Sequence, residues 1–139
     1  MDSNLKVSQL EGKPAKVPYQ ELTGSLLCLS CNTRPDISFA ISVLSGYNSN
    51  YQDVHWNLAK RVLRYLKGTM NIGLVFKKAT DVNLNGYVDA GFVFDDSDGL
   101  SYRGQAFMLG KCLISWESRK LKSVALSSTE AEYLSLSES

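Results

Sequence analysis

Apolar residues recur at helical spacing in the first part of the chain. The polar stretch before them, residues 1–17, shows no periodicity and predicts a flexible leader or linker. Pro18 is suited to the first turn of a helix. The apolar face of that helix holds three leucines, Leu22, Leu26 and Leu29. A second helix start lies at Pro35, and apolar residues then follow the i, i+3, i+4, i+7 pattern as far as a stop at Gly46.

A third helix is predicted from a cap at Asp53 through Lys67, with Gly68 as its end. Its apolar stripe consists of Leu58, Val62, Tyr65 and Leu66. Its other side carries basic residues, three of them at i, i+4 and i+7 and one beside them, which together form what we call the basic ridge: Lys60, Arg61, Arg64 and Lys67. No acidic residue lies close enough along the helix to pair with them. The ridge is therefore either a solvated helix face or a surface for phosphates, which Lys and Arg neutralise without reading sequence.

Beyond Gly68 the pattern changes to strands rich in β-branched and aromatic residues. The predicted strands cover residues 72–77, 84–94, 103–109 and 112–116. The last two form a hairpin that turns near Gly110. Residues 95–99 (DDSDG) predict a surface turn, because the calcium-loop alternative lacks a Glu at its twelfth position.

The last residues of the chain contain a helix start. Ser127 and Glu130 have the spacing of a capping box, with Ser127 as N-cap and Glu130 at the third helical position. Glu132 lies two residues further, about 200° around the helix, and projects away from Glu130. Glu130 thus has a structural role available to it, whereas Glu132 does not.

The composition is that of a soluble globular protein: 139 residues, 44% hydrophobic and 21% charged, enough for one ordinary domain or two very small ones. No run of about 18 apolar residues predicts a membrane span, and the polar start does not resemble a signal peptide. The net charge of +1 conceals an asymmetry. Residues 1–78 carry 10 − 5 = +5 and residues 79–139 carry 5 − 9 = −4, which suggests two different roles.

Cysteine and histidine residues give little support to a metal centre. Cys28 and Cys31 form a CxxC, but leucines surround them at helical spacing and no second pair follows, so we expect reduced thiols in or near the core. Reduced thiols are typical of an intracellular protein. The single histidine, His55, lies near a helix start, where we expect a structural role.

Several long motifs resemble the junction of reverse transcriptase and ribonuclease H in Pol polyproteins of copia-type retrotransposons. They are PYQELTGSLLCLS, TRPDISFAISVLS, HWNLAKRVLRYLKGT, GYVDAG, ISWESRK and VALSSTEAEY, and they cover nearly all of residues 17–136 in the order of the family. The resemblance implies an α+β fold. About three helices in residues 18–70 would correspond to the thumb and connection of reverse transcriptase. Residues 71–139 would form the first part of a ribonuclease H-like mixed sheet, an antiparallel meander, and its first helix.

The resemblance also implies a site. It places catalytic, metal-binding carboxylates at Asp89 and Glu132, with Mg²⁺, or Mn²⁺ as the alternative, as the cofactor. In the family two such cations clamp the scissile phosphate of the RNA strand in an RNA–DNA hybrid. The hybrid would be held through the basic ridge. Expected locations are intracellular: the cytoplasm, retrotransposon particles or the nucleus.

Departures from the family leave the enzymatic status open. The chain has Asp-Ala-Gly-Phe at residues 89–92 where most members have Asp-Ala-Asp-Trp. The third and fourth catalytic acids of the family lie beyond the TEAEY helix, and the paired Asp motif of the polymerase lies upstream. We therefore expect a Pol fragment with little or no activity of its own. The alternatives are a domesticated remnant that binds nucleic acid or self-associates through an unpaired sheet edge, and a relic without function.

Overall fold

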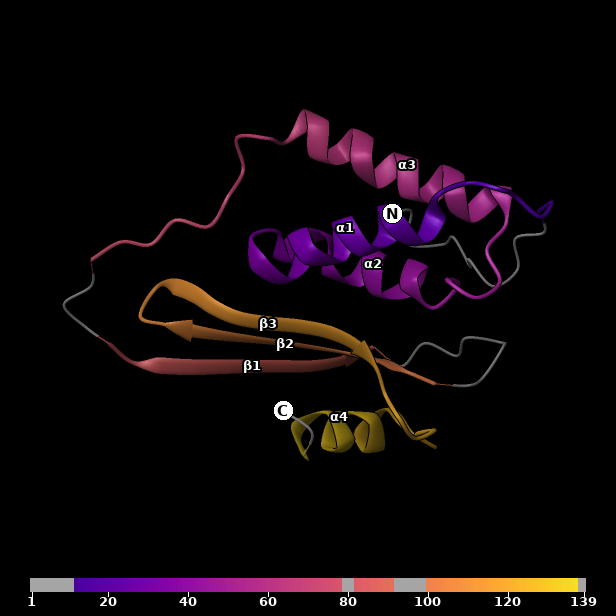
Figure 1. The fold of residues 1–139 in the computed structure, drawn as a ribbon. Helices are drawn as coiled ribbons and strands as arrows, with labels where there is room; N and C mark the ends of the chain where they lie inside the picture. Colours follow the sequence, from indigo (N-terminus) through magenta and orange to yellow (C-terminus); the bar gives the residue numbers. More distant parts are fainter. Residues whose placement is uncertain (1–11, 79–81, 92–99, 138–139) are drawn as a thin grey trace. The chain divides into compact units, whose positions relative to one another are not determined.

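The computed structural model describes residues 12–78, 82–91 and 100–137, and it contains two compact units, one within residues 1–73 and one within residues 74–139 (Figure 1). The first unit contains α1 (Tyr19–Asn32), η2 (Pro35–Ile37), α2 (Ser38–Ser45) and α3 (Asp53–Gly68). The second contains β1 (Leu84–Gly91), β2 (Tyr102–Leu109), β3 (Cys112–Lys120) and α4 (Ser128–Ser137). Helices followed by a sheet confirm the predicted α+β class.

The core of the helical unit lies where α1, α2 and α3 pack together. Its buried side chains are Tyr19, Leu26, Ile37, Ile41, Leu44, Ala59 and Val62. Tyr19 is fully buried, and its hydroxyl donates a hydrogen bond of 2.8 Å to the carbonyl of Leu44. Burial raises the pKa of Tyr19 to about 12, because an ionised phenol has no solvation in this core.

The buried face of α1 differs in part from the predicted one. It consists of Tyr19, Thr23, Leu26 and Ser30, which recur at i, i+4, i+7 and i+11. Leu29 is 42% exposed, and both Cys28 and Cys31 are exposed. The expectation of cysteines in or near the core is wrong for both: Cys28 lies on the side of the helix opposite the buried face, and Cys31 lies at its flank, about 100° from Ser30.

The start of α3 is one residue earlier than its predicted cap. Gln52, not Asp53, is the N-cap residue, and its backbone N–H donates to Nδ1 of His55 over 3.0 Å. The Asp53 carboxylate instead accepts the backbone N–H of Lys13, also over 3.0 Å. The N–H of Asp53 donates in turn to the carbonyl of Lys13. Part of the predicted leader, around Lys13, is thus hydrogen-bonded to the start of α3.

The sheet of the second unit is an antiparallel meander in the order β1-β2-β3. The turn between β2 and β3 contains Gly110 at φ 61°, a conformation that glycine adopts without a steric penalty. β3 is longer than predicted and continues to Lys120. Helix α4 packs against β1. This unit has a small core that consists of Leu121, Ala125 and Ala131. Ala90 and Leu134 pack against it.

The strand predicted over residues 72–77 is wrong. These residues form no regular element, and Ile72, Val75 and Phe76 are each more than half exposed. Their β-branched and aromatic side chains favour a strand only where a neighbouring strand completes the backbone hydrogen bonds. In the described part of the chain, Lys77 contacts instead the thiol of Cys112, which its N–H approaches at 3.4 Å.

Two other predictions lie outside the described residues: the end of the strand predicted over 84–94 and the turn predicted at 95–99. None of the helices that the structure describes has both the length and the apolar character needed to cross a membrane.

Candidate functional site

The basic ridge lies on the side of α3 that faces away from the core. At about 100° per residue, Lys60, Arg64 and Lys67 fall within an arc of about 60°. The buried residues of the helix, among them Ala59 and Val62, lie on the opposite side. Arg64 and Lys67 are exposed, as is Arg61, and Lys60 is half-buried. Within the described ranges, neither Lys60, Arg64 nor Lys67 forms an ion pair with a carboxylate.

An aromatic residue, Trp56, lies one helical turn before the basic ridge. The ammonium nitrogen of Lys60 lies 5.7 Å from the ring centroid of Trp56, within the range of a cation–π interaction. This contact directs the Lys60 side chain along the helix and leaves its charge on the surface. The geometry of Lys60, Arg64 and Lys67 is therefore consistent with cations that a ligand can reach.

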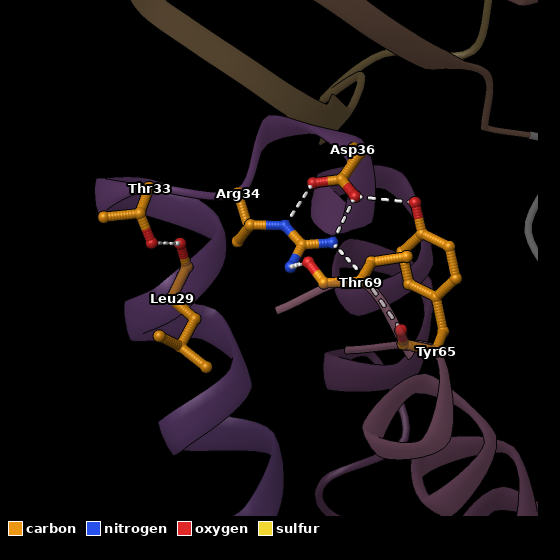
Figure 2. Close-up of polar contacts among 6 residues, drawn as sticks. All are labelled: Leu29, Thr33, Arg34, Asp36, Tyr65 and Thr69. Carbon is orange, nitrogen blue, oxygen red and sulfur yellow. Dashed lines mark hydrogen bonds and ion pairs between the residues drawn. The ribbon is translucent and has the colours of Figure 1, made fainter. Parts of the chain in front are cut away.

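The C-terminal end of α3 is fixed by a polar cluster around Arg34, shown in Figure 2. The Arg34 guanidinium donates from Nε and Nη2 to the two carboxylate oxygens of Asp36, over 2.9 and 2.7 Å. It also donates to the carbonyl and the hydroxyl of Thr69, over 3.1 and 2.7 Å. Tyr65 completes the cluster by donating its hydroxyl to Asp36 over 2.8 Å. The link joins the turn before α2 to the end of α3.

The charges of this cluster stabilise one another. The hydrogen bond from Arg34 is the main reason that the pKa of Asp36 lies below its usual value, and the same bond raises the pKa of Arg34. Donation to a carboxylate favours the neutral phenol, so the pKa of Tyr65 is raised. Arg34 is buried and committed to Asp36 and Thr69. Its charge therefore supports the ridge helix and does not add to the ridge.

Sequence reasoning missed this cluster and expected Tyr65 on the apolar stripe, although Tyr65 is 46% exposed. The only local signal was the Arg-x-Asp spacing of Arg34 and Asp36. Their third partner, Thr69, is 35 residues from Arg34, and no sequence pattern relates the two.

The two predicted catalytic carboxylates lie on neighbouring elements. Asp89 is near the end of β1, Glu132 is in the first half of α4, and both are exposed. Although α4 packs against β1, side chains alternate along a strand, so Asp89 leaves the sheet on the face opposite Ala90. Ala90 is the residue that packs against the small core containing Ala131. The structure thus brings the two elements together without showing a contact between the two carboxylates.

The capping role predicted for Glu130 is confirmed. Its backbone N–H donates to Oγ of Ser127 over 3.1 Å, and its carboxylate accepts the N–H of Leu126 over 2.7 Å. The second bond goes to the residue before the N-cap, one position earlier than in the standard capping box. The carboxylate of Glu132 takes no part in this cap.

The donor chemistry at Asp89 and Glu132 suits a hard cation such as Mg²⁺, which prefers carboxylate oxygens. Among the described residues, however, no group of three or more His, Cys, Asp or Glu side chains is placed to hold a metal ion. Two exposed carboxylates are fewer than a site for two cations requires, and we derive no catalytic step from them.

A charged pair lies on the sheet itself. Arg103 of β2 is 5% exposed and donates from Nη2 to the carboxylate of Glu117 over 2.9 Å. Gln105 contacts both residues. By the strand register Arg103 pairs with Ala90, so this partly buried ion pair lies on the face opposite Asp89. It is a structural feature and does not extend the predicted carboxylate site.

Several known proteins are similar to this chain over most of its length, and two of them are Pol polyproteins of transposons. The retrovirus-related Pol polyprotein from transposon RE2 of Arabidopsis thaliana is 46% identical over 88% of this chain and 8% of its own length. The corresponding polyprotein from transposon TNT 1-94 of Nicotiana tabacum is 42% identical over 92% of this chain and 10% of its own length. The secreted RxLR effector protein 161 of Plasmopara viticola is 44% identical, and the match covers 88% of this chain and 86% of the effector.

These similarities, the α+β fold and the ordered motifs relate the chain to the Pol polyproteins of retroelements. More particularly, the chain belongs to the copia-type retrotransposon Pol family. It spans 8% and 10% of the two polyproteins described above, but 86% of the effector. No family model matches the chain, and no solved structure matches it.

Proposed function

We propose that this chain is the thumb-to-ribonuclease H segment of a copia-type Pol protein and that it binds RNA–DNA hybrids through the basic ridge. The observation that carries the proposal is the row of exposed cations on α3, opposite the buried face of the helix. The parent enzyme, in this proposal, hydrolyses the RNA strand of the hybrid with two divalent cations. The isolated chain contributes binding and has little or no activity.

The spacing of the ridge supports contact with one nucleic-acid strand. Lys60 and Lys67 are seven residues apart, which corresponds to a rise of about 10 Å along α3. A strand of a duplex carries one phosphate per about 3.4 Å of axis, so the ridge can follow about three phosphates. Such contacts depend on charge and not on sequence. We therefore expect binding of hybrid and of duplex DNA with similar salt dependence.

The ridge is tested by measuring hybrid affinity over a range of salt concentrations. Replacing Lys60, Arg64 and Lys67 with Gln should flatten the slope of log affinity against log salt by about 2 to 3, because up to three counterions are no longer released. A control variant of the same net charge replaces three exposed lysines outside α3, Lys77, Lys78 and Lys111, with Gln. Equal slopes in the two variants would show that the ridge is only a solvated face.

Catalysis is tested separately. The proposal expects weak binding of Mg²⁺ or Mn²⁺ by Asp89 and Glu132 and no measurable release of RNA fragments from a labelled hybrid. If the purified chain does cleave the RNA and Asp89→Asn abolishes the cleavage, inactivity is wrong and the carboxylate assignment is right. Cleavage that survives this substitution would instead indicate a contaminating nuclease.

A second candidate is a stand-alone, non-catalytic module that binds nucleic acid or self-associates. It is favoured by the similarity to an effector of which the match covers 86%, because a segment of this extent then exists outside a polyprotein. In the described sheet β1 and β3 each pair with one strand only, so their outer edges are open to pairing with a second chain. Light scattering over a concentration series distinguishes the candidates: a monomer at high concentration contradicts self-association through the sheet.

A further inference from the structure

Two exposed thiols lie together on the outer side of α1. Cys28 and Cys31 are three residues apart, about 60° around the helix, where β-carbons are about 5–6 Å apart. Both are free, exposed cysteines. Cys28 lies on the side of α1 opposite the buried residues Leu26 and Ser30, whereas Cys31 lies about 100° from Ser30, at the flank of the buried face. This placement has no role in the core and none in the basic ridge, which belongs to α3.

Each sulfur has a hydrogen-bonding group beside it. Nδ2 of Asn32 lies 3.6 Å from Sγ of Cys28 and is held there by a bond of 2.7 Å to the carbonyl of the same cysteine. The hydroxyl oxygen of Ser30 lies 3.9 Å from Sγ of Cys31, but its proton is donated to the carbonyl of Leu27 over 2.8 Å. A donor next to sulfur stabilises a thiolate and orients it as a metal ligand. Asn32 is placed to do this for Cys28.

Two thiolates at this spacing supply half of a tetrahedral four-sulfur site. Because a Zn–S bond is about 2.3 Å long, two sulfurs on one zinc ion lie about 3.8 Å apart, which side chains on adjacent helical turns can reach. Within residues 12–78, 82–91 and 100–137, one chain supplies no more than this half, because that part contains no cluster of three potential ligands. The remaining two ligands must then come from elsewhere.

We propose that Cys28 and Cys31 from two copies of this chain bind one soft divalent cation, Zn²⁺ or Cd²⁺, in a four-thiolate site that joins two α1 helices. The surface beside the thiols allows this approach. A side chain at Gly24, one turn earlier, would meet nothing within 4 Å, and Leu27 is 44% exposed. Glu21 is the only charged residue of α1, so a second α1 brings little charge repulsion. Binding the cation displaces the thiol protons into solvent.

The test uses the whole chain, kept reduced with a phosphine and titrated with Cd²⁺. The thiolate-to-metal absorption should saturate at one Cd²⁺ per two chains, and the mass measured by sedimentation should double with the same stoichiometry. Zn²⁺ should produce the same dimer without the absorption band. Because binding releases protons, the apparent affinity should rise with pH.

Variants separate this site from other thiols and from the sheet edge. Cys28→Ser and Cys31→Ser should each weaken Cd²⁺ binding by at least about tenfold and abolish the metal-dependent dimer, since loss of a ligand exceeds the usual effect of an outer-shell change. Cys112→Ser should leave both the Cd²⁺ affinity and the metal-dependent dimer unchanged. Saturation at one Cd²⁺ per chain without a change in mass overturns the proposal, as does a dimer that persists in Cys28→Ser. Dimerisation without metal would instead be attributed to the sheet.

Discussion

Arg34 connects two parts of the helical unit that are far apart in the sequence. Its guanidinium is almost fully buried, and all of its described contacts go to Asp36, to Thr69 and to the ring of Tyr65. The geometry with Asp36 is bidentate, which lysine cannot reproduce. This explains in physical terms why an Arg-Pro-Asp sequence stands at the turn between α1 and α2.

Replacing Arg34 with Met should destabilise the helical unit by about 2–3 kcal/mol, because it leaves a partly buried carboxylate without its charged partner. The measurement is urea unfolding followed by circular dichroism. The pKa of Asp36 lies below its usual value, so the contribution of the pair is present above about pH 4 and is lost as pH falls through that lowered pKa. Arg34→Met should therefore lose less stability on acidification than the parent chain. Arg64→Met, at an exposed arginine of the same unit, serves as the control, and an equal loss of stability there contradicts the argument.

His55 gives a second pH dependence with a definite sign. Burial lowers its pKa below 6.5, opposed in part by Asp53, so the folded chain keeps the imidazole neutral where the unfolded chain binds a proton. Its Nδ1 accepts the N–H of Gln52, and its ring stacks on Tyr47 at 4.2 Å. The structural role expected from its position near a helix start agrees with these contacts.

The unfolding free energy should accordingly fall as pH decreases from about 6.5 toward the lowered pKa of His55. His55→Gln keeps a hydrogen-bond acceptor and removes the titration, so its stability should be flat over this interval. Because the chain has one histidine, the difference between the two pH profiles can be assigned to it. Parallel profiles for the parent and the variant would refute this assignment.

Helix α4 has little buried surface of its own and relies on its cap. It has ten residues and only Ala131 and Ser135 buried, and isolated helices of this length are marginal in water. The Ser127 hydroxyl, which accepts the N–H of Glu130, therefore contributes a large share of its local stability.

Substituting Ser127 with Ala should cost about 1 kcal/mol and increase amide hydrogen exchange in α4 roughly fivefold. Exchange in β2 should remain unchanged, because the cap acts on α4 alone. Ser128→Ala, at the first helical residue, is the matched control. Identical exchange in the two variants would show that Ser127 does not act as the cap.

Most helices and strands were predictable from residues close together in the sequence. The features that were not predictable depend on contacts between residues far apart in the sequence. The start of α4 was predictable because both members of its cap lie within four residues of each other. The ridge was predictable because helical periodicity alone fixes which side chains share a face. The strand over residues 72–77 was not, since it required a partner strand. The exposure of Cys28 likewise depended on which face of α1 meets the core.

The chain as a whole consists of two units with separate cores, one around Leu26 and one around Ala131. The residues that connect them include Val75 and Phe76, which are 68% and 66% exposed and belong to no helix or strand. Exposed apolar residues in irregular backbone are good protease substrates.

Brief chymotrypsin treatment of the native chain should therefore cut after Phe76 before it cuts within any described helix or strand. The fragments are identified by mass, and Phe76→Ser should remove this cleavage while leaving others unchanged. Earlier cleavage inside α3 or β2 would contradict the division into two stable units joined at this segment.

Helix α3 is secured at both ends, at its start by the bonds between Asp53 and Lys13 and at its end by those between Arg34 and Thr69. These bonds fix the backbone of α3, and with it the spacing of the β-carbons that carry the cations, before any ligand is present. The lysine and arginine stems remain flexible, so the charged groups can still adjust to a row of phosphates. Binding therefore orders side chains but does not have to order the helix itself.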